Sequence, residues 1–137
     1  MDSITQIIAE YASTLAFEHL TAEAVRASKQ RLIDSLGCAV GAYDSEPAQI
    51  GRRLAGGQTP GKYTGRVLYF DDRLPVESAA FINTSMIRSV DFNDRYPGGH
   101  PSDCLGALLA ISAVKASHPE VIHERRSKQF FCGFRRA

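Results

Sequence analysis

The sequence lacks the features that mark several large classes of protein. It has no tryptophan and only three cysteines, and its formal net charge is +1. An odd number of cysteines without paired spacing argues against a disulfide framework and fits a reducing compartment. A balanced charge gives no global electrostatic reason to bind a nucleic acid or a membrane surface. We therefore predict neither a nucleic-acid partner nor a membrane partner.

Targeting signals and membrane spans are missing as well. The first residues lack the basic region of a secretory leader and the arginines of an organelle leader. The longest apolar run, Cys104 to Val114, is too short to span a bilayer. With 137 residues, 44% hydrophobic and 23% charged, the chain fits one soluble domain or a piece of one. These observations predict a cytoplasmic protein.

Helical periodicity dominates the part of the chain before residue 117. Apolar residues recur at helical spacing in five segments, and several of these segments begin with a residue that favours the first turn. The predicted helices cover about residues 3–15, 21–41, 45–54, 75–90 and 104–116. The last two are apolar on several sides and are expected to be buried in a larger helical layer. The predicted fold class is all-α, with at most one short strand near residues 67–70.

Two side-chain roles follow from positions in these helices. Asp103 or Ser102 is expected to cap the last helix, because both residue types accept a hydrogen bond from the first backbone N–H groups. Cys38 and Cys104 lie in apolar runs and are expected to be small buried residues.

The end of the chain differs from the rest. Residues 1–114 hold ten Lys/Arg against thirteen Asp/Glu, whereas residues 115–137 hold six against two. No helical or strand period is visible after Ser117. We therefore predict a partial all-helical domain over residues 1–117 and a divergent basic tail over residues 118–137. Nucleic-acid binding by this tail is not favoured, since most charge runs are solvated or disordered ends.

A polar loop between the last two helices concentrates the groups that can carry out acid–base chemistry. A carboxylate and an imidazole in one loop can form a hydrogen-bonded pair, in which the carboxylate fixes the tautomer and raises the basicity of the ring. Asp91 and His100 are therefore the predicted catalytic residues. Either of them can be the group that takes the proton.

Other groups of the loop suit a carboxylate ligand. Arg95 can grip a carboxylate in bidentate fashion. The N-terminus of the following helix favours an anion near Ser102, and Asn93 adds a further polar group. Arg95, Asn93 and Ser102 are therefore predicted to bind a small polycarboxylate that loses a proton next to a carboxyl group.

The same residues also have simpler roles. Asp94 can satisfy backbone amides of the loop without a catalytic role, and Pro97-Gly98-Gly99 is typical of a turn. Asp91, Asp94 and His100 are residue types that bind metals, but their spacing matches no strong metal motif. No metal is predicted.

The loop also carries a family resemblance. Two runs, Ser89-Val90-Asp91-Phe92-Asn93-Asp94 and Gly98-Gly99-His100-Pro101-Ser102-Asp103, resemble the signature of the MmgE/PrpD family when followed by residues 106–110. That family includes 2-methylcitrate dehydratase and cis-aconitate decarboxylase. Residues 32–38 and 79–83 resemble earlier blocks of the family. The resemblance covers about residues 3–116.

The resemblance implies a large all-α domain beside a smaller α+β domain, with the active site between them. It implies a homodimer and the elimination of water from a tricarboxylate without a cofactor. The family's loop aspartate and histidine fall on Asp91 and His100. In the decarboxylase branch a threonine follows that aspartate by four residues, where this chain has Arg95. We therefore expect a hydro-lyase that acts on an acid such as 2-methylcitrate, and cis-aconitate decarboxylation is the alternative within the family.

Family chains are several times longer, and the resemblance places further active-site lysines and a histidine beyond this chain. The sequence is therefore expected to be truncated and to hold half of an active site. The alternative to an enzyme is a catalytically inactive helical fragment or interaction module. The predicted partners are a small polycarboxylate and either a second copy of the chain or a full-length relative.

Overall fold

The structure is a computed structural model that describes residues 2–118. Within these residues it holds five α-helices, two short 3-10 helices and one two-stranded hairpin, so the predicted all-α class is confirmed. In chain order the elements are α1 (Ser3–Thr14), η1 (Phe17–His19), α2 (Ala22–Gly41), α3 (Glu46–Ala55), β1 (Thr64–Arg66), β2 (Arg73–Pro75), α4 (Val76–Arg88), η2 (Pro101–Cys104) and α5 (Leu105–Ser117).

The helices begin where the sequence provides caps. Asp2 accepts a hydrogen bond from the Thr5 N–H at 2.9 Å, and Thr21 accepts one from the Ala24 N–H at 3.1 Å. The hydrogen bonds from Thr5 hold the pKa of Asp2 below its usual value. Pro75 is the N-cap residue of α4. Ser45 is the N-cap residue of α3, with a proline in the first turn. The predicted starts of the first four helices are therefore correct.

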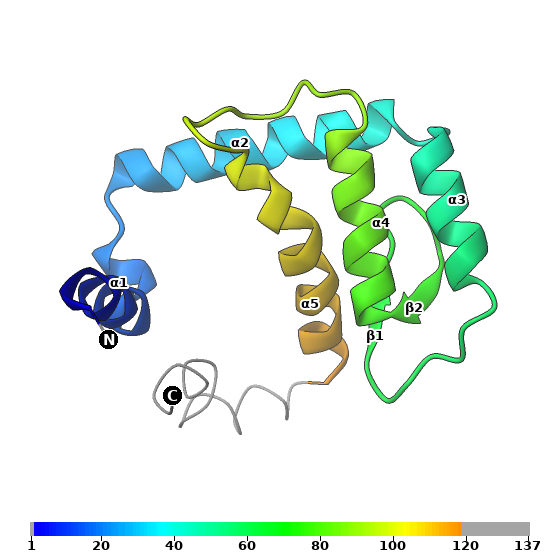
Figure 1. Ribbon diagram of the computed structural model, residues 1–137, viewed down its shortest axis with the longest axis horizontal. Coiled ribbons are helices and arrows are strands. Elements are labelled where there is room, and N and C mark those ends of the chain that lie inside the picture. Colours follow the sequence, from blue (N-terminus) through cyan, green and yellow to red (C-terminus); the bar gives the residue numbers. More distant parts are fainter. Residues whose placement is uncertain (1, 119–137) are drawn as a thin grey trace.

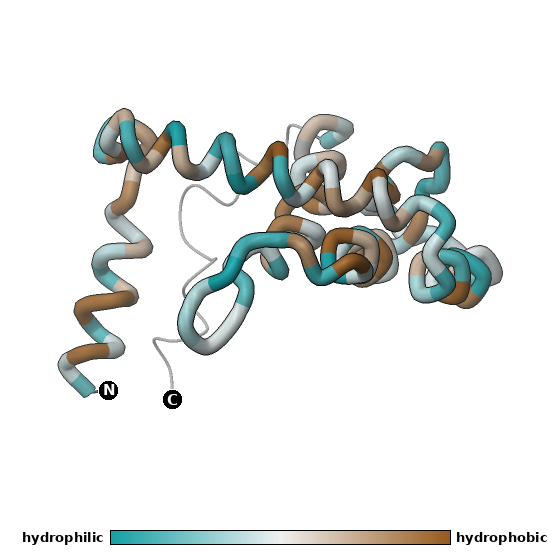
Figure 2. Tube along the Cα trace, turned by 90° about the horizontal axis from the view of Figure 1, so that it is seen from above, coloured by the Kyte–Doolittle hydropathy of each residue, from teal (hydrophilic) through white to brown (hydrophobic). Residues whose placement is uncertain are grey.

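Helix α4 lies at the centre of the arrangement (Figure 1). It packs against α5 on one side and α3 on the other, and α2 crosses its end. The hairpin lies at the opposite end of α4, where β1 contacts both α4 and α5. Helix α1 projects from the N-terminal end of α2, away from these helices (Figure 2). Both ends of the polar loop are therefore anchored in the packed helices.

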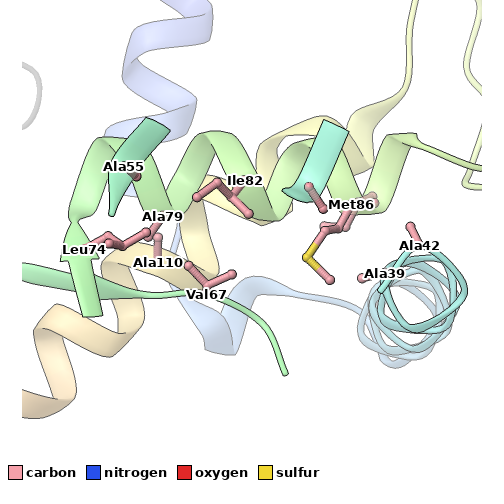
Figure 3. Close-up of a cluster of buried hydrophobic side chains, with 11 residues drawn as sticks. Ala39, Ala42, Ala55, Val67, Leu74, Ala79, Ile82, Met86 and Ala110 are labelled. Atoms are coloured by element: carbon pink, nitrogen blue, oxygen red, sulfur yellow. The ribbon is translucent and has the colours of Figure 1, made fainter. Parts of the chain in front are cut away.

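The core is built largely from small side chains on helices that approach closely (Figure 3). Ile82, Met86 and Ile87 of α4 are almost fully buried, and so is Val67 beside the hairpin. The remaining core residues are Ala39, Ala42, Ala48, Ala55, Leu74, Ala79 and Ala110. The prediction that the fourth helix is buried is thus correct for one broad face of α4, although Phe81 on that helix is 64% exposed.

The prediction that a short strand forms near residues 67–70 is wrong in its position, because the two short strands lie on either side of these residues. Those residues form the turn of the hairpin, in which Gly65 pairs with Leu74 and the strands run antiparallel. Beside its own backbone hydrogen bonds, the hairpin is held there by a side chain of α4. Asn83 accepts from the Leu68 N–H at 2.8 Å and donates to the Arg66 carbonyl at 3.0 Å.

Two expectations about single side chains need correction. No side chain caps α5, because the 3-10 turn of η2 precedes it and Cys104 occupies the N-cap position. Asp103 lies within that turn, and its carboxylate faces Arg88 at 3.4 Å. Cys38 is buried as predicted, and burial raises the pKa of its thiol. Cys104 is exposed, so its predicted burial is wrong.

No helix between residues 2 and 118 combines the length and apolarity needed to cross a membrane. Of the predicted tail, residues 119–137 lie outside the described part of the chain.

Helices α4 and α5 approach each other very closely at Gly106. A Cβ atom placed on Gly106 would lie 2.2 Å from Thr84 Oγ1 and 2.8 Å from Thr84 Cα. These distances are too short for any side chain, so the crossing of α4 and α5 requires glycine at this position.

Replacing Gly106 with alanine is expected to lower the free energy of unfolding by about 1–3 kcal/mol, because the added methyl group overpacks the crossing. Gly37→Ala is the matched control, since Gly37 lies inside α2 with nothing near its Cβ position. That change is expected to raise the free energy of unfolding by up to about 1 kcal/mol, because alanine favours helix. Urea unfolding followed by far-ultraviolet circular dichroism measures both, and shifts of the same sign would contradict the packing argument.

Candidate functional site

The candidate site is the loop that joins α4 to η2, residues 89–100, together with η2 itself (Figure 1). The loop is mainly hydrophilic (Figure 2). It turns sharply directly after α4, where Asp91 adopts φ of 50° and its N–H donates to the Arg88 carbonyl at 3.0 Å. Aspartate tolerates this left-handed conformation better than most residues.

Arg88, the last residue of α4, holds the loop together. Its Nη1 atom lies 2.9 Å from Asp91 Oδ1 and donates to Asn93 Oδ1, also at 2.9 Å. Its Nε atom lies 3.4 Å from Asp103 Oδ1 in η2. The side chain is 33% exposed, so these ion pairs are partly shielded from water. One guanidinium therefore joins the start of the loop to its end.

Sequence reasoning did not single out Arg88. The available signal was its position three residues before Asp91 at a helix end, where an ion pair of this spacing can form.

Two buried residues continue the network toward η2. The Asn93 amide donates to Ser102 Oγ at 2.6 Å, and both residues are at least nine-tenths buried. The Ser102 N–H donates to Asp94 Oδ1 at 3.1 Å. Asp94 therefore satisfies a backbone amide, as the simpler of the two roles open to it from the sequence requires. The other role is that of a metal ligand. The side chains of Asn93 and Ser102, predicted to bind substrate, are used here to hold the loop.

His100 is oriented by the backbone. Its Nδ1 atom lies 2.5 Å from the carbonyl oxygen of Asp94. A carbonyl oxygen can only accept a hydrogen bond, so Nδ1 must carry a proton. In the neutral ring Nε2 is then the unprotonated nitrogen and can accept a proton.

The predicted hydrogen bond between Asp91 and His100 is not formed within the described residues. The Asp91 carboxylate pairs with Arg88, and a backbone carbonyl takes its place beside the imidazole. The catalytic roles of Asp91 and His100 themselves stay predictions.

Arg95 lies apart from the network, next to a tight turn. Tyr96 and Gly99 exchange two backbone hydrogen bonds of 3.0 Å, with Pro97 and Gly98 at the corner. Gly98 has φ of 96°, which a type II turn requires at that position. The predicted turn is thus confirmed. Arg95 is exposed, and no hydrogen bond or ion pair links it to another residue between 2 and 118.

The structure thus brings together four of the five predicted site residues. Asp91, Asn93 and Ser102 share the Arg88 network, and His100 joins it through the backbone of Asp94. Within residues 2–118 no three His, Cys, Asp or Glu side chains gather in a way that could hold a metal ion.

Comparison with known proteins identifies the family of the chain. The family described as the MmgE/PrpD N-terminal domain matches residues 6–130 of the chain. This match runs past residue 116, where the resemblance in the sequence ended.

Three curated relatives illustrate the similarity. Cis-aconitate decarboxylase of Mus musculus is 31% identical over 88% of this chain and 25% of its own length. A probable 2-methylcitrate dehydratase of Saccharomyces cerevisiae is 30% identical over 94% of this chain and 25% of its own. The 2-methylcitrate dehydratase of Cupriavidus necator is 41% identical over 59% of this chain and 17% of its own. The chain therefore spans about a quarter or less of these relatives, and it belongs to the MmgE/PrpD family.

Proposed function

We propose that the site takes part in a hydro-lyase reaction on a small tricarboxylate such as 2-methylcitrate. A proton next to a carboxylate is removed and water is lost, without a cofactor. The observation that carries this proposal is the orientation of His100. The carbonyl of Asp94 fixes the proton on Nδ1, which leaves Nε2 as the nitrogen that can act as a base.

Asp91 is the second candidate for proton transfer, since its side chain is 73% exposed and is accessible to a ligand. Arg95 is the residue of the loop best placed to bind a substrate carboxylate, because its guanidinium has no partner within the described residues. Asn93 and Ser102 contribute by holding the loop in this shape.

The charges of the loop support the proposal that this chain supplies one wall of the site. The loop and η2 hold three carboxylates, on Asp91, Asp94 and Asp103, against the guanidiniums of Arg88 and Arg95. A tricarboxylate would be repelled by the carboxylates unless more cations approach from the opposite side. Because the curated relatives are about four times as long, we propose that such cations come from further parts of a family protein.

Dehydration is favoured over decarboxylation by Arg95, which stands where the decarboxylase branch is expected to have threonine. Relatives named as dehydratases include the 41% identical protein of Cupriavidus necator, whereas the cis-aconitate decarboxylase of Mus musculus is 31% identical over a longer stretch.

The purified chain should be incubated with 2-methylcitrate, citrate or cis-aconitate in separate arms. Absorbance of the unsaturated acid reports dehydration, and released carbon dioxide reports decarboxylation. Where the chain alone dehydrates one of the acids, His100→Gln is expected to lower the rate by about 10²-fold or more, the usual contribution of a general base. His19→Gln is the matched control, because His19 lies in η1 and not in the loop, and it should leave the rate unchanged.

Turnover that survives His100→Gln would contradict the role of His100. Carbon dioxide release without dehydration would favour the other activity of the family. A folded chain with no turnover of any of the three acids would contradict enzymatic activity of this chain alone.

A second candidate function is an interaction module that pairs with a longer family member. Helix α1 buries none of its residues. One face of it presents Ile4, Ile7, Ile8 and Tyr11, each between 61% and 68% exposed. Exposed apolar faces of this kind mark interaction sites. The occupant proposed is a full-length relative, because the chain corresponds to only a quarter of one.

Mixing the chain with the 2-methylcitrate dehydratase of Cupriavidus necator tests this candidate. We expect co-elution in size-exclusion chromatography that Ile7→Glu abolishes, since a charge in the apolar face must be desolvated on binding. Gln6→Glu adds the same charge on an exposed neighbouring position of α1 and should preserve binding. Separate elution of the two wild-type proteins at micromolar concentration would rule out this function.

A further inference from the structure

We propose that Arg88 is a positioning residue of this site: through Asn93, Ser102 and Asp94 it fixes the orientation of His100. The inference rests on the proposed function in so far as His100 is the base. The new claim is that the guanidinium of Arg88, at the end of α4 and without a contact to His100, determines the orientation of the imidazole.

The first step is the place of Arg88 in the fold. Thr84 lies one helical turn before it on the same face of α4, directly against Gly106 of α5. Thr84 Oγ1 also donates to the Asp103 carbonyl at 3.3 Å. The crossing of α4 and α5 therefore brings η2 close to the last turn of α4, and the Arg88 side chain spans the remaining gap to Asp103 at 3.4 Å.

The second step is the geometry of the guanidinium. Its Nη1 atom contacts Asp91 Oδ1 and Asn93 Oδ1, each at 2.9 Å, while its Nε atom faces Asp103. Three acceptors around one planar group require several donors in a fixed arrangement, which only arginine supplies. A lysine ammonium is a point donor on a flexible stem and cannot hold both edges of the loop in the same way.

The third step is the path from Arg88 to His100. The bond from Arg88 fixes the Asn93 oxygen, so the Asn93 amide points at Ser102 Oγ, at 2.6 Å. Ser102 in turn donates its N–H to the Asp94 carboxylate. Asp94 is held through its side chain, and its carbonyl oxygen meets His100 Nδ1 at 2.5 Å. Each link is a hydrogen bond between groups that are buried or partly buried.

The test compares Arg88→Gln and Arg88→Lys with Arg66→Gln. Arg66 is a suitable control because its ion pair, with Asp71 at 3.4 Å, is exposed and lies at the hairpin. Long-range proton–nitrogen NMR spectra report the tautomer of each histidine, and a His100→Gln spectrum assigns the signals of His100. Thermal unfolding of each variant and the kcat/KM for dehydration are measured on the same samples.

We expect the wild-type chain and Arg66→Gln to show the Nδ1-protonated form of neutral His100. Both Arg88 variants should remain folded and show a mixture of the two tautomers. Where turnover is measurable, their kcat/KM should fall by about 10²-fold, the effect of a misplacement near 1 Å. If Arg88→Gln fails to fold, Arg88→Lys carries the comparison.

A wild-type His100 spectrum in either folded Arg88 variant would overturn the proposal. Loss of cooperative unfolding in both variants would also overturn it, because Arg88 would then be needed for folding as a whole. The spectra need no turnover, so the two proposals fail separately. A chain without dehydratase activity whose His100 tautomer depends on Arg88 contradicts the proposed function and supports the positioning role.

Discussion

The close approach of α4 and α5 at Thr84 and Gly106 is the constraint on which the rest of the structure depends. A Cβ atom on Gly106 would meet the Thr84 backbone N at 2.5 Å, so the two helices are in contact along their backbones. Arg88 lies one turn beyond Thr84, and Asp103 lies three residues before Gly106. The crossing therefore sets the distance between the two ends of the loop. The conformation of the loop has to bridge that distance.

The helices could be predicted because each buries one face, and a buried face leaves a period of 3.6 residues in the sequence. The cap at Thr21 could be predicted because it is a local contact: Thr21 and the Ala24 N–H that it caps are three positions apart. The hairpin could not be placed in this way. Its turn at residues 67–70 is held by Asn83, fifteen residues further along the chain. A polar residue inside an apolar helix gives no indication of which backbone it will contact.

In the candidate site, too, local features could be predicted and contacts between distant groups could not. The corner at Pro97 and Gly98 was predictable because proline and glycine favour the two backbone conformations that the turn needs. Asp91 and His100 could be named from their chemistry, but their partners could not. The acceptor for His100 is a backbone carbonyl, a group that every residue carries and that leaves no mark in a sequence. Arg88 fits the ordinary pattern of a cation in the last turn of a helix, and its role appears only when the loop folds back onto it.

The two arginines of the site differ in their partners, and this difference separates their roles. A substrate carboxylate that approached Arg88 would have to displace Asp91 or Asn93, both at 2.9 Å, and would leave the displaced group without its donor. Arg95 can bind the same carboxylate without breaking a bond within the described residues. In the proposed site the two guanidiniums therefore have different tasks: Arg88 neutralises carboxylates that shape the loop, and Arg95 is the residue proposed to bind a substrate carboxylate. The buried hydrogen bond between Asn93 and Ser102 keeps the Asn93 oxygen directed at Arg88. Arg88 therefore stays bound within the loop and does not take over the proposed role of Arg95.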